Sequence, residues 1–582
     1  MTDTEKIWKE VKVDASKVSA IASSFPLVSK IAPLLVARGI DTVEKTAELV
    51  YGGVEYLHSP FLFPDMSKAV ERLRKALDNN ETILVYGDRD VDGVTSVNII
   101  VDTVQKVGGI IKWYVPAEEG YGLSKDVISK YALEKVKVLI TVDCGISSNM
   151  EIDYANTLGI DVILTDHHEA SSQRVPNAYA IINPKTADSK YPFKHVAGCV
   201  VALKLAQALT VSFSKEYNKD KILKKFYETN LDLCALGTIA DSMPLTDENR
   251  IIVKKGLKVI QDSPYSRPGL GLLVDDAFNS KEIKDITAKL VSWNITPVIN
   301  SPGRMHKGKL SVELLMTKDI SRAKELYEEI KKLNEKRRYL QSENVEQFKQ
   351  LLKEQCNLEN DKVLIVKASN LDHGVTGIIA SQMVKTYAKP VFLFITDGKE
   401  ATGAVRAVEG FDAVLALESV KDILIKYGGH SQAAGFTLED SKSDEFIKRI
   451  CEFAEKNLKE TSLLNTILIE SELKISDISV NYYKQLEIMQ PFGIGNLRPI
   501  FCIKKVTPTE ISVFGNKGEH LKFKISQKGS RNVSAVFWGN SKLAKFIQSE
   551  TLLDIAFNID LAGRDDNRTA QLYVLDIKPS YY

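Results

Sequence analysis

Four short apolar runs between residues 80 and 185 are each followed directly by polar residues, and this arrangement limits the possible folds more than any other feature. The runs are ILVY (83–86), VLITV (138–142), VILT (162–165) and AII (180–182), separated by segments long enough for helices. Continuous apolar runs that alternate with helices predict a parallel sheet covered on both faces. Ligands bind outside the carboxyl ends of such strands. The segments that follow the runs, GDRDVDG, DCG, DHHE and NP, are therefore expected to meet in space.

A later apolar stretch, LCALGTIA, ends at Asp241, and we interpret it as a further strand with a carboxylate at its end. Together these segments supply one dense group of titratable side chains: Asp88, Asp90, Asp92, Asp143, Asp166, His167, His168 and Asp241. So many carboxylates remain ionised together only if cations neutralise them. Oxygen ligands with one or two imidazoles and no thiolate favour Mn²⁺ or Mg²⁺ over structural zinc. Two such ions that share a carboxylate can activate water and stabilise a leaving oxygen, which predicts phosphodiester hydrolysis.

Each of these segments has a simpler interpretation when it is taken alone. An Asp-x-Asp in a glycine-rich turn is usually a turn or a helix cap, and a His-His pair more often packs than binds a metal. Four such segments occur in order, each behind a predicted strand. This repetition favours one shared metal site over four unrelated turns.

The rest of the chain predicts further units. Residues 318–354 keep helical spacing amid dense Lys and Glu, which indicates a long connecting helix or a helical pair. A second α/β unit follows, with strand-like runs at 363–366 and 391–395 and the glycine-dense YGGHSQAAGF (427–436), which we interpret as a turn before a helix. From about residue 465, short β-type runs alternate with turns and predict a small β-barrel or sandwich.

Length and charge exclude some classes of protein. At 582 residues the chain is about four times a ~150-residue domain, so several domains are expected. Lys and Arg total 77 against 76 Asp and Glu, so the chain is not a polycation that coats nucleic acid, and phosphate recognition must be local. The six cysteines form no Cys-x-x-Cys pair, and there is no signal segment or apolar run of about 18 residues. We expect a cytoplasmic protein that does not enter a membrane.

At the polar segments the chain resembles the DHH phosphoesterase superfamily and, within it, the RecJ family of single-stranded-DNA exonucleases. GDRDVDGVTS, VDCGIS, TDHHE and ALGTIADSMPL resemble its first four motifs, and the similarity continues through INPKTADSKYPFKHVAG, NITPVINSPGR, DHGVTGIIAS, YGGHSQAAGF and PFGIGN, over roughly residues 80–580. The resemblance implies an α/β fold: a parallel-sheet DHH domain, a second α/β DHH-associated domain across a cleft, and a C-terminal OB-type β-barrel. The expected units are an N-terminal helical segment (1–75), the DHH catalytic domain (76–260), a connecting region with a long helix (261–355), the DHH-associated domain (356–462) and the OB-type domain (463–582).

The resemblance also implies roles for the polar residues. Its metal ligands would be Asp90, Asp92, Asp143, His167 and Asp241, around two Mn²⁺ or Mg²⁺ ions bridged by Asp143. Pyrophosphatase-like relatives carry a histidine where this chain has Tyr86, so one metal site would be weaker or would be completed by Asp88 or water. The catalytic group would be Asp143, His168 and Asp166, with His168 facing the scissile phosphate and Asp166 orienting its neighbours.

Phosphate and strand binding are implied for residues farther along the chain. Gly428 and Gly429 would let the backbone approach a phosphate that His430 contacts, while Arg304 and Arg406 would hold the nucleic-acid backbone or a terminal phosphate. Taken alone, each arginine is better explained by a surface salt bridge. In the OB-type domain, the residues that would bind a single strand are Lys522, His520 and Trp538, and Phe537 is either a further candidate or part of the barrel core.

Two departures from the family pattern concern the 5′ phosphate. The expected Gly-Ser-x-Arg-Ser reads GAVRA at 403–407, and the loop before GYG carries Glu118 and Glu119 where an arginine is usual. The resemblance therefore supports phosphodiesterase chemistry more firmly than it supports a preference for the 5′ end.

The predicted function is a single-stranded-DNA-specific 5′-to-3′ exonuclease that releases mononucleotides in DNA repair and recombination of a bacterial cell. It is expected to be a monomer that interacts with a helicase and a single-strand-binding protein. Two alternatives remain: a phosphodiesterase of short oligoribonucleotides or small nucleotides, and a non-catalytic replication scaffold. The C-terminal β domain argues against the first, and the retained ligand residues argue against the second.

Overall fold

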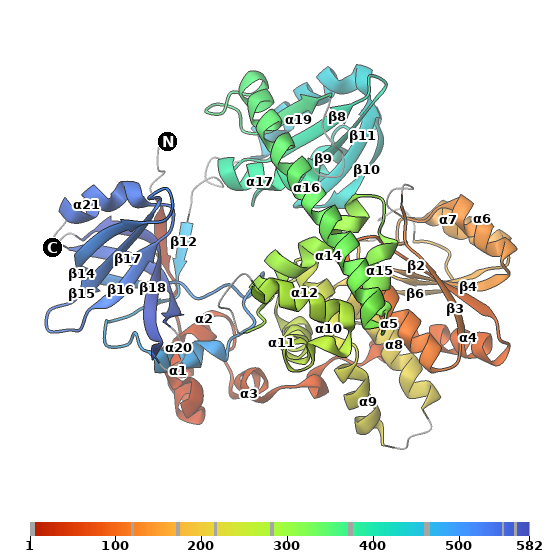
Figure 1. The fold of residues 1–582 in the computed structure, drawn as a ribbon, viewed down its shortest axis with the longest axis horizontal. Coiled ribbons are helices and arrows are strands. Elements are labelled where there is room, and N and C mark those ends of the chain that lie inside the picture. Colours follow the sequence, from red (N-terminus) through yellow and green to blue (C-terminus); the bar gives the residue numbers. More distant parts are fainter. Residues whose placement is uncertain are drawn as a thin grey trace.

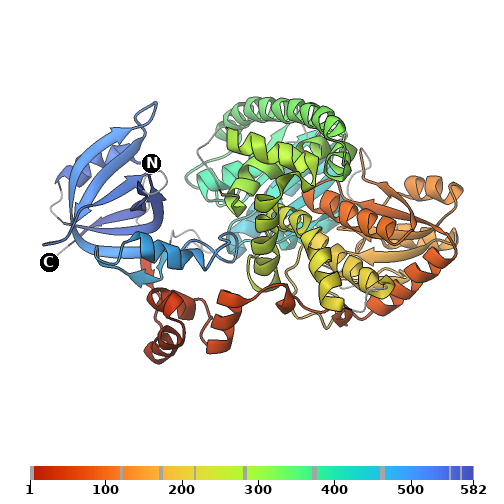
Figure 2. The same ribbon diagram turned by 60° about the horizontal axis from the view of Figure 1, so that its bottom comes forward.

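The protein is described here from a computed structural model (Figure 1). The structure describes residues 6–117, 122–169, 175–214, 218–279, 285–369, 376–458, 466–549, 552–563 and 567–580. A parallel-sheet domain and a second α/β domain above it are joined by a long helix, and a β-barrel lies to one side (Figures 1 and 2). The α/β class and the three-part architecture predicted from the sequence are thereby confirmed.

The first domain is built on a five-stranded parallel sheet of order β3-β2-β4-β5-β6. Its strands are β2 (Thr82–Gly87), β3 (Ile110–Tyr114), β4 (Val136–Val142), β5 (Asp161–Thr165) and β6 (Ala180–Ile182). Four of them coincide with the predicted apolar runs. The remaining strand, β3, escaped prediction because it forms the sheet edge and none of its residues is buried.

Helices cover both faces of this sheet. The helices that contact the sheet are α4 (Met66–Asp78), α5 (Val91–Lys106), α6 (Lys125–Leu133), α7 (Asn149–Thr157) and α8 (Gly198–Phe213). Behind them, α9 (Lys219–Glu228), α10 (Leu231–Ala240) and α11 (Asp247–Asp262) pack on other helices. The central helix α5 begins where the Asp90 carboxylate accepts a hydrogen bond from Gly93 N, an N-cap that satisfies a free N–H of the first turn. Apolar residues then bury α5 between the sheet, α8 and α10.

The stretch LCALGTIA is helix α10, and its prediction as a strand is wrong. A short apolar run cannot be assigned to a strand or a buried helix by periodicity alone. This run forms a helix that is covered on all sides by α5, α8 and α11, so that almost every residue is buried. Asp241 therefore stands at the carboxyl end of a helix rather than of a strand.

A helical region links the first domain to the second. It contains α12 (Pro268–Asn279), α13 (Ala288–Leu290), α14 (Thr296–Arg304), α15 (Lys309–Met316) and α16 (Ile320–Gln355). The predicted long helix is a single helix, α16, which begins at the Asp319 cap and packs first on α14 and then on the second domain. It runs from one domain to the other in Figure 1.

The second domain has a five-stranded mixed sheet of order β10-β11-β9-β8-β7. Its elements are β7 (Leu364–Ala368), α17 (Thr376–Tyr387), β8 (Val391–Thr396), β9 (Glu400–Arg406), α18 (Ala413–Glu418), β10 (Leu424–His430), β11 (Ala433–Glu439) and α19 (Ser443–Asn457). The glycine-dense segment 427–436 forms the β10–β11 hairpin, so its interpretation as a turn before a helix is wrong. Its glycines face an antiparallel partner strand rather than opening a helix.

The C-terminal domain is a closed barrel. The elements are β12 (Thr466–Ile469), β13 (Ser471–Glu472), α20 (Val480–Glu487), β14 (Phe501–Phe514), β15 (His520–Ser526), β16 (Val533–Phe537), α21 (Ala544–Ser549), β17 (Leu553–Ala562) and β18 (Thr569–Pro579). Strand β14 pairs with both β15 and β17, which closes the ring of five strands. Phe537 is 5% exposed and belongs to the barrel core.

The N-terminal residues belong with the barrel rather than with the domain that follows them in sequence. They form β1 (Ile7–Glu10), α1 (Ala15–Ser24), α2 (Ala32–Ala37) and α3 (Val43–Tyr51). Strand β1 pairs in parallel with β12, and apolar residues of the three helices share one core with the barrel. The expected segment 1–75 is thus divided, because α4 packs on the first sheet.

Within the described residues, no helix is both long enough and apolar enough to cross a membrane.

Candidate metal centre and strand path

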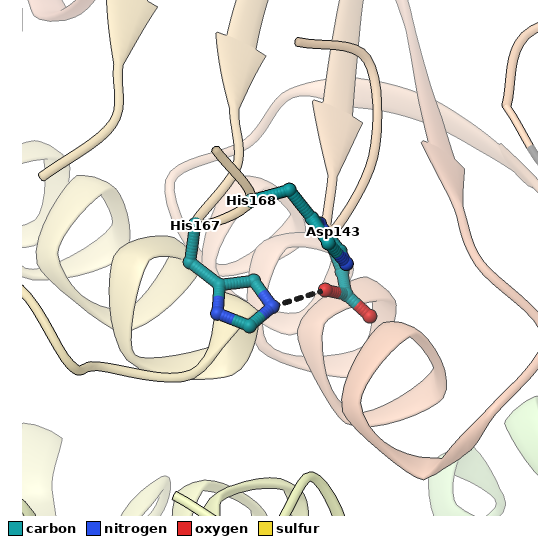
Figure 3. Close-up of side chains that lie close together, drawn as sticks. All are labelled: Asp143, His167 and His168. Carbon is teal, nitrogen blue, oxygen red and sulfur yellow. Dashed lines mark ion pairs between the residues drawn. The ribbon is translucent and has the colours of Figure 1, made fainter. Parts of the chain in front are cut away.

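The carboxyl ends of β2, β4 and β5 bring the predicted residues together, as parallel-strand geometry requires. Asp143 follows β4, and His167 and His168 follow β5. Figure 3 shows the His167 ring and the Asp143 carboxylate pointing toward each other beneath these strand ends, with His168 beside them. The His167 Nε2 and Asp143 Oδ1 atoms are 3.2 Å apart.

Two helices complete this group. Asp92 lies in the first turn of α5, and Asp241 caps the end of α10. His167 Nε2 lies 3.6 Å from Asp241 Oδ2 and 3.9 Å from Asp92 Oδ2. Asp92, His167 and Asp241 form one cluster of potential ligands, and Asp88, Asp90 and Asp143 form another. Asp143 also clusters with His167 and His168, so its carboxylate lies between the two groups.

Several donor atoms of the cluster are buried and without a hydrogen-bond partner in the described part of the chain. They are both ring nitrogens of His167, Asp143 Oδ1 and Asp241 Oδ2. Each such atom costs about 1–3 kcal/mol when it stays unsatisfied, so native proteins rarely leave them in one place. A divalent cation bound among oxygens and imidazole nitrogen removes this cost, and the residues present fit it. The donor set contains no thiolate.

Glycines make room for these carboxylates. A Cβ at Gly198 would lie 2.6 Å from Asp143 Oδ1, and one at Gly237 would lie 2.7 Å from Asp92 Oδ1. The start of α8 also donates to Asp92: Gly198 N is 2.7 Å from Oδ2 and Cys199 N is 2.9 Å from Oδ1. A helix N-terminus favours a carboxylate at this position. Asp92 is therefore held in place by the backbone.

The carboxylates resist ionisation when no cation is bound. Burial raises the pKa of Asp88 to about 7 and of Asp92 to about 6, and the charge of Asp90 adds to both effects. Burial and the neighbouring aspartates raise the pKa of Asp143 and of Asp241 well above the ordinary value. Burial and the charge of His168 lower the pKa of His167 to about 3, so its imidazole is neutral at pH 7 and has a lone pair free for a cation.

Asp143 sits in a rare backbone conformation. Its φ is +59°, in the left-handed region that non-glycine residues seldom adopt, and its N–H donates to Thr165 O at 3.1 Å. Such conformations are held at functional sites by the surrounding structure. The bond to the end of β5 fixes the turn that aims Asp143 at His167.

Asp166 orients both histidines from beneath the cluster. Its Oδ1 accepts hydrogen bonds from His168 Nδ1 at 2.7 Å and from His167 N at 2.7 Å, and its Oδ2 accepts from Ile146 N at 2.9 Å. Burial opposes ionisation of Asp166, but the His168 bond outweighs it and lowers the pKa of Asp166 to about 2. Burial likewise opposes the charge of His168, yet the bond to Asp166 raises the pKa of His168 to about 9. His168 is thus an imidazolium at pH 7.

Tyr86 is buried on the other side of β2. Its hydroxyl donates to Gly122 O at 3.1 Å, and its ring packs among apolar residues of the face covered by α6 and α7. The structure therefore gives Tyr86 no place among the ligand atoms, whereas Asp88 lies with Asp90 and Asp143.

The second domain approaches the cluster through its hairpin. The ring of His430 stacks on that of His168 with centroids 5.2 Å apart and planes 16° from parallel. Gly429 has φ +144°, and a Cβ there would meet Ala433 O at 2.4 Å, so this position requires glycine; nothing lies within 4 Å of a Cβ at Gly428. The backbone around Gly428 thus leaves open space beside His430.

The two predicted arginines are linked electrostatically to the cluster. Arg304, at the end of α14, keeps an exposed side chain, although desolvation by the surrounding protein lowers its pKa and the charge of Asp90 acts against that shift. Arg406 donates to Ser381 Oγ at 3.0 Å and to Val405 O at 2.8 Å. Burial lowers the pKa of Arg406 to about 10, and the charge of Arg304 contributes. The two guanidiniums are therefore close enough for their charges to interact.

Lys185 is a cation that the sequence reasoning did not single out. Its charge acts on His167, His430 and Asp241, and its Nζ lies 3.1 Å from Glu169 Oε1. It follows β6 directly after the Asn-Pro pair, and Asn183 Nδ2 donates to His168 O at 3.0 Å. The polar segment after the fourth apolar run was the available signal.

The barrel carries an exposed aromatic group at one end of β15 and β16. Trp538 is 52% exposed, and its ring centroid lies 4.6 Å from that of His520 and 5.5 Å from that of Phe514. Lys522 is exposed two residues along β15 from His520, so both project from the same side of the strand. Glu118 and Glu119 lie outside the described residues.

Family models match three parts of the chain: the N-terminal domain of the DHH family at residues 82–238, the DHHA1 domain at 360–456 and the RecJ OB domain at 469–576. The single-stranded-DNA-specific exonuclease RecJ of Bacillus subtilis is 30% identical over 573 residues, which cover 98% of this chain and 70% of the relative.

Solved structures agree with these matches. The crystal structure of RecJ in complex with Mn²⁺ from Thermus thermophilus superposes with a TM-score of 0.83 at 25% identity, covering all of this chain and 81% of that one. A crystal structure of exonuclease RecJ bound to manganese gives a TM-score of 0.57 at 31% identity, over 70% of this chain and 99% of that one. The predicted resemblance is confirmed, and the chain belongs to the RecJ family of the DHH superfamily.

Proposed function

We propose that this chain is a divalent-metal-dependent exonuclease specific for single-stranded DNA. The observation that carries the proposal is the buried, unpartnered donor set of Asp143, His167 and Asp241 in a chain that has all three RecJ-family domains. Unpaired donors of this kind are expected where a cation belongs. RecJ relatives bound to Mn²⁺ and to Mg²⁺ support the same class of cofactor.

Two ions would be held, one by Asp92, His167 and Asp241 and one by Asp88 and Asp90, with Asp143 shared. Support comes from the two ligand clusters and from the position of Asp143 between them. When bound, such a pair of cations supplies charge that activates water and stabilises the leaving oxygen of a phosphodiester. The protein residues fix the ligand atoms and exclude bulk water, since Asp92, Asp143 and His167 are each no more than 3% exposed.

His168 would donate a hydrogen bond to the scissile phosphate. Its imidazolium is stabilised by Asp166, whose carboxylate is itself fixed by backbone N–H groups. A positive donor aimed at a phosphoryl oxygen stabilises charge that develops in the transition state. His430 stacks on this ring and would keep it oriented while contacting an adjacent phosphate from the second domain.

The strand would pass between the first two domains and continue toward the barrel. Arg304 and Arg406 supply two guanidiniums near the cluster, where planar forks suit phosphate oxygens. On the barrel, Trp538 and His520 offer ring faces for stacking, with Lys522 beside them for the backbone. Hydrolysis would proceed from the 5′ end and release mononucleotides, in repair and recombination.

The test is digestion of an internally labelled single strand of DNA blocked at its 5′ end, its 3′ end or neither, with Mn²⁺. Protection by the 5′ block alone is the expected result. Protection by the 3′ block alone would still support an exonuclease but would overturn its proposed 5′-to-3′ direction. The direction is in question because Ala404 and Ala407 stand where the family pattern has hydroxyl side chains. Faster cleavage of a short oligoribonucleotide than of the DNA strand would overturn the assignment of single-stranded DNA as the substrate.

A further inference from the structure

The carboxylate of Asp241, a predicted metal ligand, stands at the carboxyl end of α10, where a loop leads on to α11. Asp92 is held by the start of α8, and Asp166 is held by the backbone. In contrast, Asp241 Oδ2 has no hydrogen-bond partner in the described part of the chain. Its position therefore depends on the backbone: its N–H ends α10 by donating to Gly237 O at 2.9 Å, and the next five residues, 242–246, form the Asp241 loop that leads to α11.

The Asp241 loop is bound from outside by the C-terminal domain. Leu245 N donates to Ile494 O at 2.7 Å. Ile494 belongs to residues 488–497, here called the barrel loop, which includes PFGIGN and follows α20. In Figures 1 and 2 the blue chain after α20 reaches the yellow-green helices of the first domain. Residues about 250 positions apart thus share a backbone hydrogen bond four residues from a predicted metal ligand.

The contact is close enough to require glycine in the barrel loop. A Cβ at Gly495, where φ is +71°, would lie 2.8 Å from Pro244 Cβ, and one at Gly493 would lie 2.7 Å from Leu245 Cδ1. Arg250 of α11 adds a second bond between the domains, from its Nη2 to Ile488 O at 2.7 Å. The Asp241 loop therefore fits directly against the barrel loop.

One asparagine gives the barrel loop its shape. Asn496 Nδ2 donates to Met489 O and to Pro491 O, each at 2.8 Å, and the residue is 9% exposed. Its Oδ1 accepts from Arg38 Nη1 at 2.6 Å, and Arg38 also binds Leu497 O and pairs with Glu470 at 2.6 Å. The N-terminal helices, the barrel loop and the Asp241 loop form one continuous set of hydrogen bonds.

We propose that the barrel loop is a positioning element for Asp241, so that the metal centre is complete only when the C-terminal domain is docked on the first domain. Asn496 and Arg38 act through the loop and touch neither metal nor substrate. This inference rests on the proposed function, because it assigns the barrel a task at the metal centre in addition to holding the strand. Outer partners of this kind change metal affinity by orienting the ligand.

The test compares Asn496→Asp with Asn558→Asp in the full chain. Asn496→Asp keeps an acceptor for Arg38 but removes both donors to the loop carbonyls. Asn558 is a matched control, because its Nδ2 also donates to two carbonyls of the same domain, Pro499 O at 2.7 Å and Arg498 O at 3.4 Å, away from the Asp241 loop. Mn²⁺ binding is measured from the electron paramagnetic resonance signal of the free ion, and nuclease activity is measured as a function of Mn²⁺ concentration.

In Asn496→Asp, one class of Mn²⁺ site is expected to bind the ion about tenfold more weakly, which is the lower end of the effect of losing a residue that orients a metal ligand. Raising the Mn²⁺ concentration should restore nuclease activity. A purely structural lesion would not be rescued by the ion. Unchanged affinity in a folded Asn496→Asp, or an equal loss in Asn558→Asp, overturns the inference. If Asn496→Asp does not fold, Arg38→Lys, which loses the fork to Asn496 and Leu497, decides by the same criterion. Failure of the wild-type protein to bind Mn²⁺ would instead overturn the proposed function, and this inference with it.

Discussion

His168 Nδ1 lies 2.7 Å from Asp166 Oδ1, and the same oxygen accepts the backbone N–H of His167 at 2.7 Å. One buried carboxylate therefore orients two consecutive histidines with different tasks: His167 is neutral and faces the aspartates, while His168 is charged and faces the second domain. The two protonation states follow from geometry, because only His168 shares its ring proton with Asp166.

Asp166→Asn is expected to reduce nuclease activity about 10–100-fold, the usual cost of losing an outer partner of a metal ligand or catalytic group. The raised pKa of His168 means that its pairing with Asp166 stabilises the folded protein fully below pH 6.5 and is lost as the pH rises through about 9. In the variant, the pKa of His168 should fall below 6.5, as measured by NMR titration of the metal-free protein. Asp102→Asn, which breaks the exposed pair with Lys106, is the control. A pKa still near 9 in Asp166→Asn would contradict this account of His168.

The metal-free protein is expected to lose stability as the pH rises from about 4 to about 7. Asp88 and Asp92 have folded pKa values of about 7 and 6, above their unfolded values, so the stability associated with them is present at low pH and lost as each is forced to ionise. Each such proton changes the free energy of unfolding by about 1.4 kcal/mol per pH unit across its window. The melting temperature in EDTA should fall further below the melting temperature in Mn²⁺ as the pH increases.

Asp143→Asn provides a matched variant for that experiment. The carboxamide removes one buried charge without changing the shape of the side chain, so the metal-free variant should be more stable than the wild type at pH 8. If the thermal stability of the two proteins in EDTA depends on pH in the same way, the loss of stability does not come from the buried aspartates of this cluster.

Trp538→Ala should weaken binding of a long single strand, because stacking of a base on an aromatic ring contributes about 1–3 kcal/mol. This corresponds to about 5–150-fold in the dissociation constant, measured by fluorescence anisotropy in EDTA. Trp293→Ala is the control, since Trp293 is 68% exposed but lies on the connecting helices. Equal effects of the two substitutions would show that the barrel surface has no special part in strand binding.

The predictable parts of the fold are those that local sequence encodes. Strands β2, β4, β5 and β6 are continuous apolar runs, and α16 keeps its helical spacing throughout. The apolar run of α10 was misassigned, because whether it is a helix depends on the helices packed around it. The pairing of Ile7–Glu10 with Thr466–Ile469 joins segments more than 450 residues apart, and no local pattern specifies it.

The candidate site divides in the same way. Carboxylates behind strands could be predicted, since parallel strands bring their ends together. The contact between Leu245 N and Ile494 O could not, because it depends on how two domains pack. Lys185 lies in a segment that resembles the family, but its effect on His167 and His430 arises from proximity across loops, which the segment alone does not show.

The most direct measurement is nucleotide release from linear and from covalently closed circular single-stranded DNA, with Mn²⁺, by the wild-type protein and by Asp143→Asn. The wild type should degrade the linear strand to mononucleotides and leave the circle intact, and EDTA or Asp143→Asn should abolish release. Cleavage of the circle, or release by Asp143→Asn at the wild-type rate, would contradict a metal-dependent exonuclease centred on Asp143.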